Sequence, residues 1–133
     1  MRWRAGLPVV VLALSAGCSG SGPRALKDAT GNRVPQDVAE IYRGEAHCDW
    51  ESLTIVLLGK RKYIADPKHK IVAPGQYVGE YAASVPVPAD AVDTGYRSGK
   101  LQVFEANDKT YAYLSKGATA QRLPAAVPGF GCD

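Results

Sequence analysis

"SLTIVLLGKRKYIAD", residues 52–66, is the stretch that decides the fold expected for this chain. Its first part, 52–59, is a near-continuous run of apolar, β-prone residues, which is typical of a central strand buried on both faces. The "GKRK" that follows suits a turn into a second strand, "KYIAD". Asp66 and Pro67 end that strand, because proline has no N–H group to donate to a sheet. The stretch therefore predicts an antiparallel hairpin.

Two more strand patterns lie downstream. Residues 100–106, "KLQVFEA", and 109–116, "KTYAYLSK", flank an Asn-Asp pair. Two β-prone runs around such a turn predict a second hairpin. Residues 118–126, "ATAQRLPAA", predict a further edge strand that ends at Pro124.

The segment between the two hairpins is mixed. Residues 76–85, "QYVGEYAASV", alternate between the two faces of a strand and predict one strand. Pro74 and Gly75, just before it, form a turn pair. Residues 86–95, "PVPADAVDTG", read as a proline-punctuated loop with one helical turn at 89–92.

Helix signals precede the first hairpin, in "PQDVAEIYRGEAH". Asp37 can cap a helix, and Glu40 three residues later can complete a capping box. Three apolar residues then fall on one helical face: Val38, Ile41 and Tyr42. The pattern predicts a short helix at 37–43.

Composition agrees with one small domain and a leader. The chain has 133 residues, of which 46% are apolar and 22% charged, as in soluble globular proteins. We therefore predict a mainly β fold over residues 37–133. It is a small antiparallel meander of five or six strands, open-barrel or sandwich-like, with one short N-terminal helix packed on it.

The N-terminal segment has the layout of a secretory leader. Arg2 and Arg4 precede a twelve-residue apolar stretch, 5–16, that contains Pro8. A membrane-spanning helix needs about 20 residues, so this stretch is too short to cross a bilayer. It reads as the apolar region of a signal peptide, residues 1–17.

The end of this leader resembles the lipobox of bacterial lipoproteins, which places small or aliphatic residues before an obligatory cysteine. Here the residues are Ser15, Ala16, Gly17 and Cys18. The resemblance implies cleavage before Cys18, acylation of its thiol with a diacylglyceryl group and acylation of the new amine. The lipid bilayer is then a partner, and the chain is anchored on the extracytoplasmic side of the cell membrane. The alternative is an ordinary signal peptide with an incidental cysteine.

Residues 18–36 read as a flexible tether, because they are rich in Gly, Ser, Pro and charge and lack apolar periodicity. Charge argues against nucleic-acid binding. Removing 1–17 takes away two of the 16 basic residues, leaving 14 against 13 acidic ones, a net charge of +1. No basic run marks a nucleic-acid surface.

Two cysteines remain, Cys48 and Cys132. In an exported chain two thiols normally pair, so we predict a structural disulfide between them. The alternative is a redox or metal site, although the two do not form a CxxC pair. A bridge between them would staple a small sheet that needs such support.

The densest polar cluster is "HCDWES", in which His47, Asp49 and Glu51 alternate. On a strand they would project from one face and could bind zinc, or tune a proton carrier. The alternative is a polar entry to a strand, with Trp50 in the core. No nucleophile motif or phosphate-binding loop occurs, so we expect no catalytic residue and no cofactor, and assign no metal site.

Tyrosines are the more informative group. Tyr77 and Tyr81, and Tyr111 and Tyr113, form same-face pairs on the expected strands. An exposed tyrosine face is a good binding surface, because the ring is large, stiff and half polar. The alternative is that these rings fill the interior of a small sheet.

A second resemblance is to membrane-bound lysozyme inhibitors, which are small β-barrel lipoproteins. It rests on Ser98-Gly99, followed by "SKGA" at 115–118. The resemblance implies that Ser98 and Lys116 enter the lysozyme cleft opposite its acidic pair.

The sequence thus predicts a membrane-anchored envelope lipoprotein with a small binding or structural domain and no catalytic machinery. Its partners would be the bilayer, through acylated Cys18, and an envelope protein or glycan. Two alternatives stay open. One is an inhibitor of a secreted hydrolase, and the other is a metal-dependent enzyme that uses His47, Asp49 and Glu51.

Overall fold

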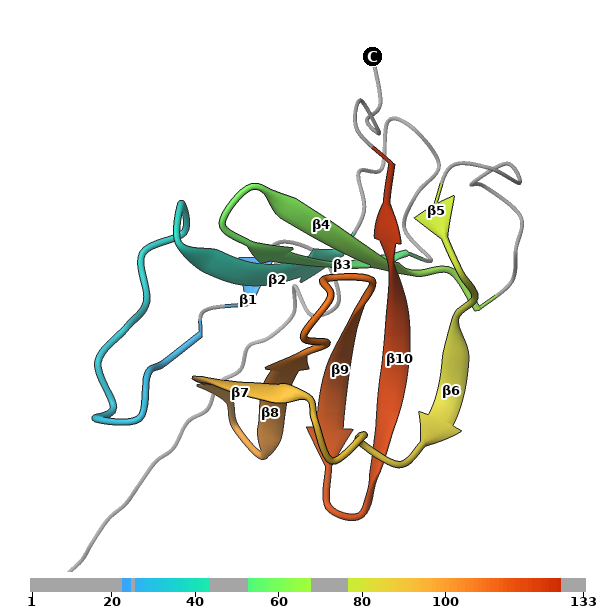
Figure 1. Cartoon of the computed structure of the whole chain (residues 1–133). Helices are drawn as coiled ribbons and strands as arrows, with labels where there is room; N and C mark the ends of the chain where they lie inside the picture. Colours follow the sequence, from blue (N-terminus) through green and yellow to red (C-terminus); the bar gives the residue numbers. More distant parts are fainter. Residues whose placement is uncertain (1–22, 25, 44–52, 68–76, 128–133) are drawn as a thin grey trace, which may run out of the picture.

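The computed structural model describes residues 23–24, 26–43, 53–67 and 77–127, and every regular element among them is a β-strand (Figure 1). None of these residues belongs to a helix that could cross a membrane. The strands are β1 Pro23–Arg24, β2 Ala39–Arg43, β3 Thr54–Leu58, β4 Arg61–Ala65, β5 Tyr77–Val78, β6 Ala82–Val85, β7 Val92–Ser98, β8 Leu101–Glu105, β9 Tyr111–Lys116 and β10 Thr119–Ala126.

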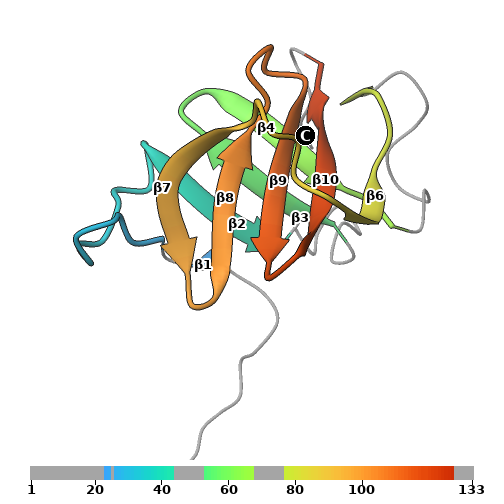
Figure 2. The ribbon, with the colours of Figure 1, turned by 60° about the horizontal axis from the view of Figure 1, so that its bottom comes forward.

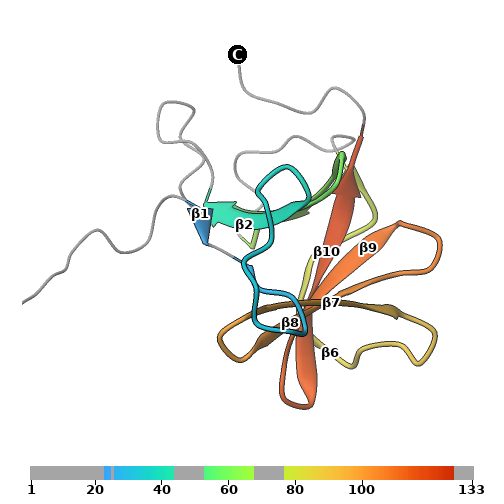
Figure 3. The same cartoon turned by 90° about the vertical axis from the view of Figure 1, so that its left-hand side faces the viewer.

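The strands form an open, strongly curled antiparallel half-barrel. Their order is β1-β2-β3-β4-β10-β9-β8-β7, and β5 and β6 also pair with β10. β10 joins the two halves, because it pairs with β9 along its length and with β4 at Ala125. Figure 3 shows β2 running across the direction of β10. The main core lies between the halves and includes Leu58, Tyr63, Val103, Leu114 and Leu123.

The first hairpin is confirmed, as β3 and β4, and so is the burial of β3 on both faces. Val56 belongs to the main core, whereas Ile55 packs with Leu53 and Ile64 in a second cluster. The second predicted hairpin is also confirmed, as β8 and β9. These segments were predictable because apolar pattern and turn chemistry agree in each of them.

The helix predicted at 37–43 is wrong, because Ala39–Arg43 form β2. β2 pairs with β3 and buries Ala39 and Ile41, at 1% and 4% exposure, while Val38 is 41% exposed. Burial of every second residue is the pattern expected of a strand, whose side chains point alternately to its two faces. Pairing with the apolar β3 therefore outweighed the local capping signals.

The second half of the expected tether belongs to the folded domain. β1 pairs with β2, and Leu26 and Val34 are buried in the main core. Lys27 forms a β-bridge with Arg97 of β7, and each backbone N–H donates to the other residue's carbonyl at 2.8 Å. This segment therefore contacts strands from both ends of the sheet path.

Two predictions in the middle of the chain are wrong. The single strand at 76–85 is broken into β5 and β6 at Gly79, which has a φ of +89° that glycine adopts readily. The helical turn at 89–92 is replaced by a turn at 89–90, after which β7 begins at Val92. The main path thus has eight strands, more than the five or six expected.

β10 is central, not the edge strand expected, and Pro124 lies inside it. Ala125 N donates to Thr110 O, so the backbone nitrogen of Pro124 faces away from β9. On that side the partners change between Arg122, opposite β6, and Ala125, opposite β4 and β5. Pro124 therefore lies between the residues of β10 that pair with β6 and those that pair with β4 and β5, so its lack of an N–H group breaks no pairing with these strands.

A candidate ligand pocket on the outer face of β9

Tyr111 and Tyr113 lie together on the face of β9 opposite the main core, which confirms that they form a same-face pair. Their ring centroids are 6.4 Å apart and their planes are inclined by 46°. Tyr81 lies apart from them, packed against the main core, where its hydroxyl donates to Gln121 Oε1 at 3.3 Å. Tyr77 pairs through its backbone with Ala126, and its side chain lies outside the described part. The structure therefore supports one tyrosine pair of the two.

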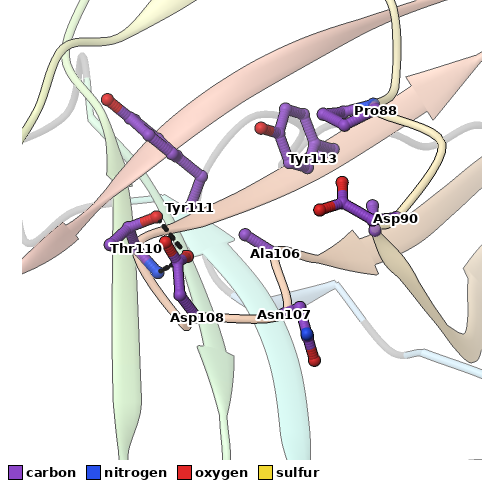
Figure 4. A pocket seen from close by; sticks show the side chains of 9 residues that line it. Pro88, Asp90, Ala106, Asn107, Asp108, Thr110, Tyr111 and Tyr113 are labelled. Atoms are coloured by element: carbon purple, nitrogen blue, oxygen red, sulfur yellow. Dashed lines mark hydrogen bonds between the residues drawn. The ribbon is translucent and has the colours of Figure 1, made fainter.

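A chain segment far from β9 in the sequence covers this pair. After β6, residues 86–91 cross the outer face of β10 and β9 to reach β7 (Figure 1 and Figure 2). Between this crossing segment and the β8–β9 turn lies an open pocket of about 370 Å³. Its lining, seen in Figure 4, consists of Pro88, Asp90, Ala91, Ala106, Asn107, Asp108, Thr110, Tyr111 and Tyr113.

Tyr113 is the most deeply placed polar residue of the pocket. It is only 5% exposed, and Figure 4 shows its ring beside Pro88. No described residue forms a hydrogen bond with its hydroxyl, and burial raises the pKa of that hydroxyl. The ring of Tyr113 is thus buried, whereas its hydroxyl opens into the pocket with unused hydrogen-bonding capacity.

Two carboxylates lie at the rim of the pocket. Asp108 Oδ1 accepts hydrogen bonds from Thr110 N at 3.1 Å and Thr110 Oγ1 at 2.6 Å. These bonds, that of the hydroxyl first, lower the pKa of Asp108 and keep the group charged. Asp108 Oδ2 accepts none from the described residues, and Asp90 lines the pocket from the crossing segment. The rim therefore offers negative charge and free acceptor atoms.

Close packing holds the ring of Tyr111. The guanidinium of Arg122 lies 4.8 Å from the ring centroid, and Arg122 Nε donates to Glu80 O at 3.2 Å. On another side the ring lies against the backbone of Gly79, where an added Cβ would be 2.7 Å from Tyr111 Cζ. A glycine inside an expected strand was the only sequence signal for this close approach.

The inner side of the same hairpin carries a second polar group, centred on Glu105, which is 4% exposed. Arg61 Nε donates to Glu105 Oε2 at 2.6 Å and Arg61 Nη2 to Oε1 at 3.0 Å, and the Tyr63 hydroxyl also donates to Oε2. Lys109 Nζ lies 3.5 Å from Oε1. Burial raises the pKa of Glu105, but the bonds from Arg61 and Tyr63 outweigh it and the pKa is lowered. Every acceptor is engaged, so this group ties β4 to β8. Sequence reasoning missed it.

Ser98 is the last residue of β7, and Lys116 is the last residue of β9. Both strands finish at the same end of the sheet. Ser98 pairs with Leu101 of β8, and Ser115 pairs with Gln102 on the other side of that strand. Ser98 and Lys116 therefore flank the start of β8, about 10 Å apart, or two strand spacings. The β7–β8 and β9–β10 turns lie side by side at the bottom of Figure 2.

The remaining predicted residues lie outside the described part of the chain: Cys18, Cys48, Cys132, His47, Asp49 and Glu51. The lipid anchor, the disulfide and the zinc alternative thus stay predictions. Comparisons of this chain with models of protein families, with curated proteins and with solved structures find no match.

Proposed function

We propose that this chain is a lipoprotein of the cell envelope, anchored through acylated Cys18, whose β domain binds a small ligand between β9 and residues 86–91. The lipobox-like pattern at 15–18 supports the anchor. The pocket on the outer face of β9 supports the binding role. The proposal assigns the chain no catalytic residue.

The hydroxyl of Tyr113 carries the proposal. The hydroxyl of a buried tyrosine ring can still form a hydrogen bond where it opens into a pocket, and such a bond contributes about 0.5–1.5 kcal/mol net. Tyr113 is 5% exposed and has no hydrogen-bond partner among the described residues. A ligand with a polar group at this position would supply that bond in place of water.

The rim indicates the class of ligand. Carboxylates accept hydrogen bonds and attract positive charge, and aromatic faces attract organic cations. Asp90 and Asp108 line the pocket together with two tyrosines, and its volume of about 370 Å³ suits a compact molecule. The pocket therefore fits a small ligand that presents an ammonium group and other hydrogen-bond donors, such as an amino sugar.

A pair of sugars tests the pocket. Glucosamine carries an ammonium group where glucose carries a hydroxyl, so we expect glucosamine to shift the NMR signals of Tyr113 and Asp108 more strongly. Tyr113→Phe should weaken binding about tenfold, the value of one hydrogen bond of about 1.4 kcal/mol. Tyr81→Phe, whose hydroxyl faces the other side, is the matched control. Pocket signals that respond to neither sugar would count against the ligand class.

The anchor has its own test. Intact-mass analysis of the chain from membranes should show a mature form that begins at Cys18 and carries diacylglyceryl and amide-linked acyl groups. Cys18→Ala should appear without these lipids and in the soluble fraction. A wild-type chain with a bare Cys18 thiol would contradict the anchor.

One observation favours a second candidate, an inhibitor of a secreted hydrolase. Ser98 and Lys116, distant in sequence, flank the start of the same strand. A muramidase assay with the purified chain tests it, with Lys116→Ala as the variant and Lys60→Ala, in the β3–β4 turn, as the control. Absence of inhibition at micromolar concentration would dismiss this candidate.

A further inference from the structure

Basic side chains gather where the N-terminal segment meets β7. Lys27 forms β-bridges with both Arg33 and Arg97. Directly opposed residues of antiparallel strands project their side chains to the same face. The neighbours Leu26 and Val34 are buried in the main core, so the three basic side chains project outward. None of them forms an ion pair with a described residue.

Two hairpin turns add to this group. Lys100 lies in the β7–β8 turn, two residues after Ser98. Lys116 is the last residue of β9, beside the β9–β10 turn. Both lysines are exposed. Arg97 pairs with Gln102, which pairs with Ser115, so the backbone of Lys116 lies about two strand spacings from that of Arg97. Lys116 has the strand parity of the core-facing Leu114, so it reaches this end of the sheet from the opposite face. We call the five residues the basic end: Lys27, Arg33, Arg97, Lys100 and Lys116.

Acidic groups near the basic end are few among the described residues. Asp28 is adjacent in sequence, but its Oδ1 accepts bonds from Thr30 N, Thr30 Oγ1 and Asn32 N within its own turn. Asp93 lies four residues before Arg97 on β7. Five positive charges against these two leave an excess that nothing described neutralises.

The basic end is close in the chain to the predicted anchor. Only four residues, 19–22, lie between Cys18 and Pro23, where β1 begins. The five Cα–Cα steps from Cys18 to Pro23 span at most about 18 Å, so the domain would be held near the bilayer. Surface charges interact over about 10 Å at moderate ionic strength, so charges on this side of the domain would lie within reach of headgroups.

We infer that the basic end contacts the anionic phospholipid headgroups of the membrane that carries the chain. The inference rests on the proposed anchoring through Cys18. The β8–β9 turn, which borders the ligand pocket, lies at the other end of β8 from the β7–β8 turn. Contact through the basic end therefore leaves the pocket facing away from the bilayer, open to ligands.

Lysine labelling tests the inference. The full chain is mixed with vesicles of phosphatidylcholine, or of phosphatidylcholine and phosphatidylglycerol in equal amounts, and treated with N-hydroxysuccinimidyl acetate. Mass spectrometry then gives the acetylation rate of each lysine. On anionic vesicles we expect Lys27, Lys100 and Lys116 to react about fivefold more slowly, which corresponds to ~1 kcal/mol per basic residue near an anionic surface. Lys60, in the β3–β4 turn, serves as internal control and should be unaffected.

Variants and salt sharpen the result. Arg33→Glu keeps every reporter lysine and should reduce the protection, whereas Lys60→Glu, with the same final charge, should leave it unchanged. About 1 M salt should abolish it, because the screening length falls to about 3 Å. Equal rates on both kinds of vesicle, or equal protection of Lys60, would overturn the inference. The mass of the N-terminal peptide reports acylation separately, so loss of the anchor and loss of the contact are distinguished.

Discussion

Tyr63 and Tyr113 are both buried tyrosines of the same half-barrel, but only one has a partner for its hydroxyl. Tyr63 faces the main core and donates to Glu105, which Arg61 also holds. Tyr113 lies on the outer face, beneath residues 86–91, and bonds to no described residue. Both rings are buried, but the Tyr63 hydroxyl is held inside the core, whereas the Tyr113 hydroxyl opens into the pocket.

The carboxylates beside these tyrosines differ in the same way. Glu105 and Asp108 are three residues apart, at the end of β8 and in the turn after it. Glu105 has both oxygens engaged across strands, whereas Asp108 bonds only to Thr110 in its own turn. The inner group is closed and structural, and the outer group is open. The following predictions test that contrast.

The largest effect is expected at Glu105. Glu105→Ala removes the acceptor of Arg61 and leaves the buried Tyr63 hydroxyl with only the weaker bond to Lys109 O at 3.3 Å, and should cost about 3 kcal/mol of unfolding free energy. Asp90→Ala, at the open rim, should cost less than about 0.5 kcal/mol. Urea unfolding followed by far-UV circular dichroism measures both. Equal losses would remove the contrast between the two groups.

The same substitution at the two tyrosines gives the next largest difference. Tyr63→Phe removes a hydrogen bond to a charged group and should cost about 2 kcal/mol. Tyr113→Phe removes a hydroxyl without a described partner and should change stability by less than about 0.5 kcal/mol. Chemical denaturation of the two variants side by side provides the comparison. A large loss at Tyr113 would mean that its hydroxyl is structurally engaged.

A smaller effect is expected at two glycines with the same φ of +89°, Gly79 and Gly31. An alanine at either position is strained by about 1 kcal/mol, but only at Gly79 does the new Cβ meet Tyr111. Gly79→Ala should therefore also move the Tyr111 ring, which NMR signals of Tyr111 and Arg122 would report. Identical spectra near β9 in the two variants would argue against the close packing.

The smallest effect is expected from pH. Burial raises the pKa of Glu105, and the hydrogen bonds from Arg61 and Tyr63 lower it, so that the net change is a lowering. A lowered folded pKa gives stability that is present above the ordinary glutamate pKa and lost as pH falls through the folded value. Between about pH 6 and about pH 2, Glu105→Gln should thus lose less stability than the wild type. Parallel curves would show that Glu105 titrates alike in both states.

Sequence patterns predicted the segments in which local signals agree with the tertiary partner. The β3–β4 hairpin and the β8–β9 hairpin combine apolar runs with suitable turns, and both form as expected. Residues 37–43 carried helix-capping signals, but a neighbouring apolar strand made β2 the better state. Local capping contributes about 1 kcal/mol, less than the burial of two apolar side chains.

The candidate site was partly predictable. The Tyr111–Tyr113 pair follows from the alternation of a strand and was found in the sequence. Pro88 and Asp90 were read as loop residues, and only the crossing of residues 86–91 over β9 places them beside Tyr113. No spacing rule links residues that meet because a connection passes over a sheet.

The sequence by itself determined the strand-rich character of this protein, its two best hairpins and the tyrosine pair, because periodicity and turn chemistry are local properties. The tertiary structure alone decided that β1 and Lys27 pair with strands of the sheet, that β10 is central, and which tyrosine hydroxyl is bonded within the core. Those outcomes depend on which distant backbone and side-chain groups meet, and that is settled only when the sheet curls and closes its core.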